Sequence, residues 1–240
     1  MHVSGPADSR LILVGLVHLD PEGFRRLGDL LARIQPDAVT VEASRHGLDF
    51  RVSNGQGMLN EVGRTINKLA VVPDAVAGSD EQAATITRML GHGAIESIRR
   101  QMRIPFEVRA VRDYCRRIGA NWEPIDSDEH SRRETANWSE LTCPANIARL
   151  LQTEHYNLAD AVRQQTKLAL SALNGESTAG EPPPDLFQRD RLMAARIGEL
   201  LASGPGRITH IGGWRHIIPG EPDNLLGLLA VLNPRIIMLA

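Results

Sequence analysis

The sequence has few of the features that mark membrane-bound or disulfide-bonded proteins. No apolar run approaches the roughly 20 residues that a membrane-spanning helix needs, and residues 1–10 lack a basic-then-apolar signal segment. The only two cysteines, Cys115 and Cys143, are not spaced as a CxxC pair, so neither a disulfide framework nor a zinc ribbon is predicted. We therefore expect a soluble, cytoplasmic protein.

Charge of either sign is not in excess. The net charge is -2 at pH 7, and the 25 arginines that stand against only 2 lysines are scattered and balanced by acidic residues. Such a chain has no field that would attract nucleic acid or an anionic membrane. We expect no nucleic-acid partner and no membrane partner.

What is present is enough apolar sequence for a sizeable core. The chain has 240 residues, of which 42% are hydrophobic, which suits one domain with an insert. We predict a single α/β domain over residues 1–240, with a largely helical insert at about 55–185.

Short, uncharged, β-branched runs predict the strands of a buried parallel sheet. A helix over 21–34 joins the first two runs, so a right-handed crossover and parallel pairing are expected there. A weaker run carries Pro124 and predicts an edge or irregular strand. We expect a mixed, mainly parallel sheet flanked by helices, with strands at 11–17, 38–44, 121–126, 207–213 and 235–240.

Helical periodicity fills most of the remaining chain. Residues 130–173 carry the longest such pattern, spaced like a coiled-coil seam, which is typical of a helical hairpin or of a homodimer contact through the insert. Gly119 follows one predicted helix at the place of a C-terminal cap. The other helices are predicted at 80–103, 106–118, 185–202 and 223–232.

Ionisable side chains occur where the predicted strands end. His18 follows the first strand, Glu42 ends the second, Asp126 ends the weak strand, and His216 follows the run ITHIGG. Because the carboxyl ends of parallel strands share one edge, and ligands bind at that edge, these four side chains are expected to converge. The glycines of IGG predict a sharp turn and a close approach of the backbone to a ligand.

The predicted helix at 185–202 has a charged interruption in its apolar stripe. Arg189 and Asp190 lie in its first turns, among Leu186, Met193 and Ile197. A charge on an inward face is costly without a partner, so Arg189 is expected to meet a carboxylate or an anionic ligand. The alternative is that Arg189 lies at the solvent end of the stripe.

The order and spacing of these segments resemble a known family. VGLVHLD, TVEAS, FEVRAVRDYCRRIGANWEPID, QRDRLMA and IGGWRH are similar to motifs of the TraB/PrgY family and its TIKI relatives, within a wider group of erythromycin esterase-like and ChaN-like proteins. The resemblance covers residues 10–240. It includes two GxxH elements and the acidic residues at 42, 107 and 126. Gln188 departs from the acid usual in the family, and Trp214 with Arg215 replaces small residues, which would narrow or alter the substrate site.

The resemblance implies a hydrolase of peptide or ester bonds that depends on a divalent metal ion, with a small-molecule or peptide substrate. His18, Glu42 and His216 would bind the ion, for which mixed nitrogen and oxygen ligands suit manganese, cobalt or zinc. Arg189 would stabilise an oxyanion or hold a substrate carboxylate. The supporting residues around the ligands would be Glu107, Asp126 and Asp190.

Two other functions remain open from the sequence. One is a metal-free, esterase-like hydrolase, in which a histidine is the general base and Glu42 holds its tautomer. The other is a non-enzymatic protein that binds a peptide or another small ligand in the same cleft. The remaining histidines, including His210, are interpreted as ordinary structural residues.

Overall fold

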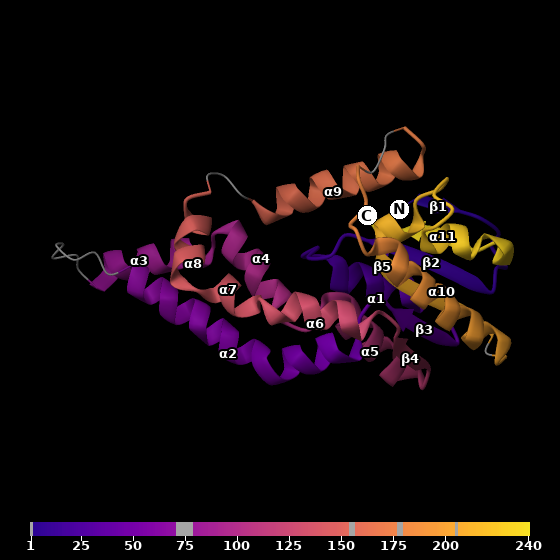
Figure 1. Cartoon of the computed structure of the whole chain (residues 1–240), viewed down its shortest axis with the longest axis horizontal. Coiled ribbons are helices and arrows are strands. Elements are labelled where there is room, and N and C mark those ends of the chain that lie inside the picture. Colours follow the sequence, from indigo (N-terminus) through magenta and orange to yellow (C-terminus); the bar gives the residue numbers. More distant parts are fainter. Residues whose placement is uncertain (1, 71–78, 154–156, 177–179, 205) are drawn as a thin grey trace. The chain divides into compact units, whose positions relative to one another are not determined.

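The computed structural model describes residues 2–70, 79–153, 157–176, 180–204 and 206–240 (Figure 1). It divides into two compact units, each formed by separate stretches of chain. The sheet unit comprises Met1–Arg45, Pro105–Asp128 and Val162–Ala240. The helical unit comprises His46–Ile104 and Glu129–Ala161.

A six-stranded mixed sheet forms the centre of the sheet unit, in the order β1-β6-β2-β5-β3-β4. Only β1 runs antiparallel to its neighbour, β6, and the other pairs are parallel. The predicted α/β class with a mainly parallel sheet is therefore confirmed. The strands are β1 (His2–Ser4), β2 (Leu11–Leu16), β3 (Ala38–Val41), β4 (Asn121–Pro124), β5 (Ile208–Gly213) and β6 (Arg235–Met238).

The two longest strands lie side by side in the middle of the sheet. Every residue of β2 and β5 is buried, as expected when both faces of a sheet are covered; β2 is wholly apolar, whereas β5 also buries Thr209 and His210. Their register pairs Leu16 with Gly213, so both strands end at the same level. The weak strand β4 is at the edge of the sheet, as its Pro124 predicts.

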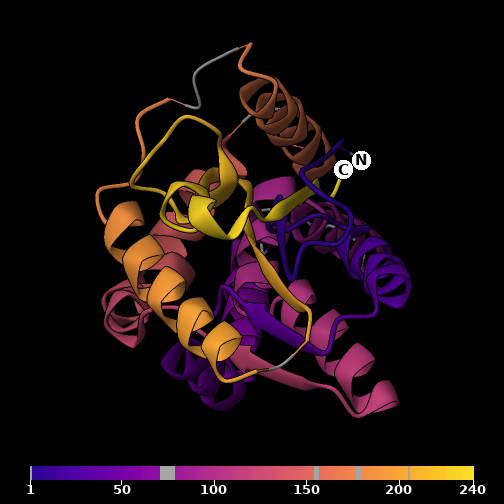
Figure 2. The same cartoon turned by 90° about the vertical axis from the view of Figure 1, so that its right-hand side faces the viewer.

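Helices cover both faces of this sheet. Helices α1 (Gly23–Ile34) and α5 (Phe106–Ile118) pack together on one side, and α10 (Leu186–Ala202) lies on the other (Figure 2). Gly23 allows the close packing, because a Cβ there would fall 2.3 Å from the ring of Phe106. The α10 face buries Leu13, Met193 and Ile197 in one core cluster, to which the end of α9 (Leu158–Leu173) and the short α11 (Leu225–Leu228) also contribute.

The helical unit has its own core. Val62 and Ile66 of one helix pack with Ile95 and Ile147, and Trp138 closes the cluster. Besides the start of α9, the unit contains most of α2 (Arg45–Leu69) and α6 (Asp128–Ala136), with α3 (Ser79–Leu90), α4 (Gly93–Gln101), α7 (Trp138–Thr142) and α8 (Pro144–Leu151).

Three helix predictions were wrong in extent. The segment 80–103 is two helices, because His92 caps α4 by accepting the Ala94 N–H on its Nδ1. The segment 130–173, predicted as a helical hairpin or a dimer contact, contains four helices, α6, α7, α8 and α9, with Pro144 starting α8 at the position where proline is tolerated. The segment 223–232 holds only α11 and the 3-10 turn η2 (Ala230–Leu232). Strand β1 lay outside every prediction.

In the part of the chain that the structure describes, no helix is both long and apolar enough to cross a membrane.

Candidate functional site

Four predicted site residues stand at the carboxyl edge of neighbouring strands. His18 lies in the turn after β2, Glu42 follows β3 directly, and Asp126 lies two residues beyond β4. His216 lies in η1 (Trp214–Ile217), the 3-10 turn that continues β5. Because β2, β5, β3 and β4 are consecutive neighbours, the four residues reach one edge of the sheet.

Glu42 is the centre of this edge. Its carboxylate is 7% exposed, and the Nε2 atoms of His216 and His18 lie 3.0 Å from Oε1 and 3.6 Å from Oε2. The backbone N–H of Gly213 donates to Oε2 at 2.5 Å, and Arg189 donates to Oε1 through Nη2. The structure therefore brings both histidines to opposite oxygens of the predicted glutamate.

Each imidazole is held from behind by a second carboxylate. Glu107, in the first turn of α5, lies 2.9 Å from Nδ1 of His18, and Asp190, the fifth residue of α10, lies 2.5 Å from Nδ1 of His216. A carboxylate accepts the proton of Nδ1, which leaves Nε2 to face Glu42. The side chain of His18 is 46% exposed, whereas that of His216 is 3% exposed.

Arg189 has the carboxylate partners that its inward position predicts. Its Nε and Nη2 donate to the two oxygens of Asp126 at 2.9 and 2.7 Å, and Nη2 also donates to Glu42. Such a two-point contact fixes the guanidinium plane. Arg189 thus ties the carboxylate after β4 to the one after β3, and its Nη1 makes no hydrogen bond to a described residue.

The seven predicted site residues form one group, here named the polar cluster. Its four carboxylates face one guanidinium, so its charge is −3 while both imidazoles are neutral. A buried excess of negative charge is unfavourable, and either two protons on the imidazoles or one divalent cation would reduce it to −1. The polar cluster consists of His18, Glu42, Glu107, Asp126, Arg189, Asp190 and His216.

The ionisation of the cluster follows from these contacts. Burial by itself lowers the pKa of His216, but Glu42 and Asp190 outweigh it and raise the pKa to about 9. The pKa of His18 is also raised, because hydrogen bonds to Glu107 and Glu42 outweigh desolvation. Burial alone would raise the pKa of Glu42, yet the two imidazoles hold it well below its usual value.

The glycines that end β5 serve the site by leaving space. A Cβ at Gly212 would fall 3.0 Å from Glu42 Oε2, and one at Gly213 would fall 3.0 Å from His18 Nε2. Neither glycine has a positive φ, so the predicted need for a special backbone conformation is wrong here. They are needed because the side chains of Glu42 and His18 pack against the bare backbone.

The bulky residues of the second GxxH element do not fill the edge as expected. Trp214 is 5% exposed, and it packs into the core cluster on the α10 face of the sheet. The guanidinium of Arg215 lies over the Trp214 ring, 5.0 Å from its centre. The extra mass of Trp214 is therefore taken up by the core, while Arg215 is half-buried beside it.

One further histidine, interpreted from the sequence as an ordinary structural residue, is buried near the polar cluster. His210, in β5, is 1% exposed, and its Nδ1 lies 3.0 Å from the Thr40 hydroxyl of β3. Burial lowers its pKa to about 3, so its imidazole is neutral. Residues two apart in a strand point to the same face, so the sequence alone places His210 on the same face of the sheet as Gly212.

The donors of the polar cluster fit a divalent ion in chemical type. Two imidazole nitrogens and a carboxylate are ligands of zinc, cobalt and manganese, and carboxylates behind both imidazoles are the usual support of metal-binding histidines. Among the described residues, no three His, Cys, Asp or Glu side chains are already arranged around one point. In the polar cluster, both oxygens of Glu42 are engaged by Arg189, His216 and Gly213.

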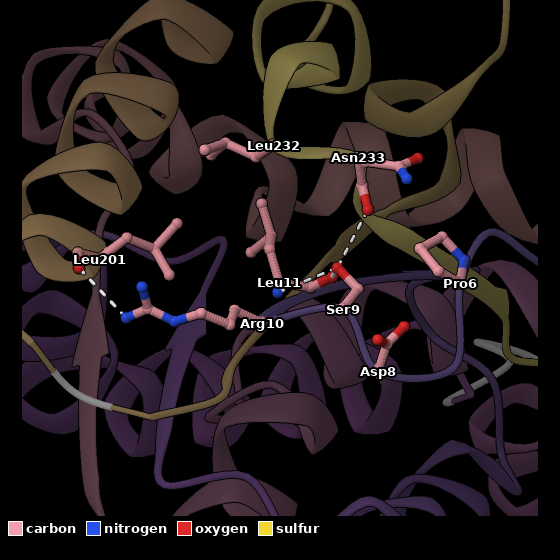
Figure 3. A pocket seen from close by; sticks show the side chains of 8 residues that line it. All are labelled: Pro6, Asp8, Ser9, Arg10, Leu11, Leu201, Leu232 and Asn233. Atoms are coloured by element: carbon pink, nitrogen blue, oxygen red, sulfur yellow. Dashed lines mark hydrogen bonds between the residues drawn. The ribbon is translucent and has the colours of Figure 1, made fainter.

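A pocket of about 280 Å³ lies elsewhere, at the amino end of β2 and thus at the opposite edge of the sheet (Figure 3). Its polar groups support the local backbone: Ser9 Oγ donates to the Leu11 or Asn233 carbonyl, at 2.9 and 3.0 Å, and Arg10 donates to Leu201. It is lined by Pro6, Asp8, Ser9, Arg10, Leu11, Leu201, Leu232 and Asn233.

Comparison with models of protein families, with curated proteins and with solved structures finds no match to this chain.

Proposed function

We propose that the polar cluster hydrolyses a peptide or ester bond of a peptide or small-molecule substrate, with a divalent metal ion as its cofactor. One observation carries the proposal: the Nε2 atoms of His18 and His216 face the carboxylate of Glu42, while another carboxylate holds each Nδ1. This arrangement, together with the motif resemblance, supports membership of the TraB/PrgY/TIKI group.

Three side chains would hold the ion: His18, Glu42 and His216. A bound Mn²⁺, Co²⁺ or Zn²⁺ supplies an activated water, because it lowers the pKa of that water towards about 7. Glu107 and Asp190 keep the two imidazoles in the tautomer that presents Nε2. The imidazoles must release their Nε2 protons for this role, so binding of the ion is expected to release protons.

Arg189 is suited to the charge that develops on the substrate. Asp126 fixes its Nε and Nη2, so the guanidinium is oriented before any substrate arrives. Its side chain is 14% exposed, and Nη1 makes no hydrogen bond to a described residue. We assign Nη1 as the donor to the developing oxyanion, a role for which preorganised donors are effective.

His18 is the most accessible group of the cluster, since its side chain is 46% exposed while Glu42 and His216 are at or below 7%. Water and substrate therefore meet the cluster at His18. Substrates that fit would place the scissile carbonyl between this imidazole and Arg189.

The exposed His18 also favours a second candidate, hydrolysis without a metal. The pair of Glu107 and His18, joined at 2.9 Å, is a carboxylate that orients an imidazole, and Nε2 of His18 would act as general base on water once the pH exceeds the raised pKa of this imidazole. In this scheme Glu107 holds the tautomer, rather than Glu42, which was expected to do so. Arg189 and the second histidine would then keep Glu42 in place.

The test is metal content and turnover of the purified protein. We expect bound Mn, Co or Zn by elemental analysis, and hydrolysis of peptide or ester libraries that chelation abolishes and the metal restores. Full metal occupancy in His18→Ala and His216→Ala would contradict the metal site. Hydrolysis that survives strong chelation would favour the metal-free scheme, and ligand binding without cleavage would contradict both.

A matched pair of arginine variants tests the role of Arg189. Arg189→Gln should lower kcat by a factor of about 100 or more, as loss of an oxyanion donor does. Arg191 lies on the same helix, is 63% exposed, and pairs with the exposed Asp223. Arg191→Gln should therefore leave turnover unchanged.

A further inference from the structure

His210 lies beside the polar cluster, and one of its ring nitrogens has no hydrogen-bond partner among the described residues. It is 1% exposed, and its Nδ1 is paired with the hydroxyl of Thr40 at 3.0 Å. Its Nε2 is buried and has no hydrogen-bond partner among the described residues. Leaving a buried polar atom unpaired costs about 1–3 kcal/mol, so an apolar residue would suit this core position better unless Nε2 acts on a neighbour.

The neighbour of that nitrogen is Glu42. A Cβ at Gly212 would fall 3.0 Å from His210 Nε2 and 3.0 Å from Glu42 Oε2, so the two atoms border the same space. The register of the sheet supports this proximity, because Thr40 of β3 pairs with His210 of β5. Glu42 follows Thr40 by two residues, and Gly212 follows His210 by two residues, so Glu42 and Gly212 also lie opposite each other. Gly212 therefore leaves the imidazole and the carboxylate with no side chain between them.

The tautomer of His210 follows from its two surroundings. If the Thr40 hydroxyl donates to Nδ1, the proton of the neutral imidazole is on Nε2, and the N–H dipole faces the ionised Glu42. The opposite tautomer would turn the Nε2 lone pair towards the carboxylate, which is repulsive in a buried setting of low dielectric constant. Electrostatics therefore favours the first tautomer.

We propose that His210 is a positioning residue for Glu42: Thr40 holds it in the Nε2–H tautomer, and this N–H is a fixed neutral donor group whose dipole faces Oε2 across the space left by Gly212, without a hydrogen bond to it. Its consequence for turnover rests on the proposed function. Because the donor carries no net charge, it stabilises the Glu42 carboxylate between His18 and His216 without competing for the metal ion.

The tautomer is measured directly by two-bond ¹H–¹⁵N correlation spectra of protein labelled with ¹⁵N-histidine. We expect His210, assigned as the signal lost in His210→Gln, to carry its proton on Nε2. Thr40→Val should shift the population towards Nδ1–H. The neighbouring Thr209 is also fully buried, with an unpaired hydroxyl, but points to the other face, so Thr209→Val should leave the signal unchanged. A wild-type His210 with its proton on Nδ1 overturns the proposal.

A pair of His210 variants tests the effect on the site. Glutamine carries an amide nitrogen near the place of Nε2, whereas leucine fills the volume without a donor. His210→Leu should lower both kcat and the affinity for Mn²⁺ or Zn²⁺ by about tenfold with little change in KM, the size expected for an outer partner of a metal ligand. His210→Gln should recover most of both losses. Equal loss in the two variants, or none in either, would contradict the positioning role.

These readouts separate the inference from the proposed hydrolase. The tautomer is observed without any substrate, and metal affinity is measured by calorimetry on the metal-free protein. If the wild-type protein hydrolyses nothing, the proposed function fails, and the spectra of the wild type and Thr40→Val still decide whether Thr40 holds His210 in the Nε2–H tautomer.

Discussion

The metal-free protein should lose stability as the pH rises from 6 to 9, because folding raises the pKa of His216. The buried imidazole has a pKa of about 9, since Glu42 and Asp190 outweigh desolvation, while an unfolded histidine titrates near 6.5. The folded state therefore binds a proton that the unfolded state gives up. This favours folding fully below about pH 6.5, and the advantage disappears as the pH passes through 9.

The size of the effect follows from the shift. Each pKa unit is worth about 1.4 kcal/mol, so the move from 6.5 to about 9 corresponds to about 3 kcal/mol. The pKa of His18 is raised as well and contributes in the same direction. Glu42 adds no slope in this range, because its lowered pKa changes stability only at acid pH.

The assay is urea unfolding of chelator-treated protein at pH 6.0, 7.5 and 9.0. We expect the free energy of unfolding to fall by about 3 kcal/mol or more across the series. His216→Asn should lose most of this pH dependence, whatever its absolute stability, while Arg191→Gln should retain it. A wild-type change below about 1 kcal/mol, or an undiminished slope in His216→Asn, would refute the charge assignment of the cluster.

Three further predictions concern the space beside Gly213, the left-handed backbone at Gln35, and the pH dependence of metal binding. Gly213→Ala would place its Cβ 3.0 Å from His18 Nε2 and 3.3 Å from Glu42 Oε2, so turnover should fall at least tenfold. Gly198 lies in the interior of α10, and a Cβ there would meet no atom within 4 Å. Gly198→Ala should therefore raise the free energy of unfolding by about 0.5–1 kcal/mol. Gln35 is exposed at the end of α1 with φ 49, so Gln35→Gly should raise the unfolding free energy by up to about 1 kcal/mol; no change or a loss would contradict the strain. Added Zn²⁺ or Mn²⁺ should raise the melting temperature more at pH 8.5 than at pH 6.5, because protons compete for the imidazoles, and the reverse order would contradict imidazole ligation.

The core of the sheet was predictable because its signals are local. The run of β2 is apolar at every position, and that of β5 carries no charged residue; such patterns indicate strands covered on both faces. The positions of His18 and His216 just beyond these runs then placed them at one edge. Arg189 was likewise predictable, since a charge within an apolar stripe needs a partner.

The helical unit was less predictable because periodicity does not show where a helix stops. Residues 130–173 keep apolar spacing across the breaks before α7, α8 and α9, and only capping contacts and Pro144 mark the actual ends. The break ahead of α4 depends on the imidazole of His92 as a cap, which is an unusual choice.

The sequence by itself determined the parallel strands of the sheet, the edge at which polar residues gather, and the identity of those residues, because the hydrophobic pattern of a strand and the residue that follows it are local along the chain. Only the tertiary structure decided the pairing: Glu107 behind His18, Asp190 behind His216, and His210 beside Glu42. Those contacts join residues up to 168 positions apart, and their directions depend on side-chain torsions and on space left by Gly212, which no local pattern records.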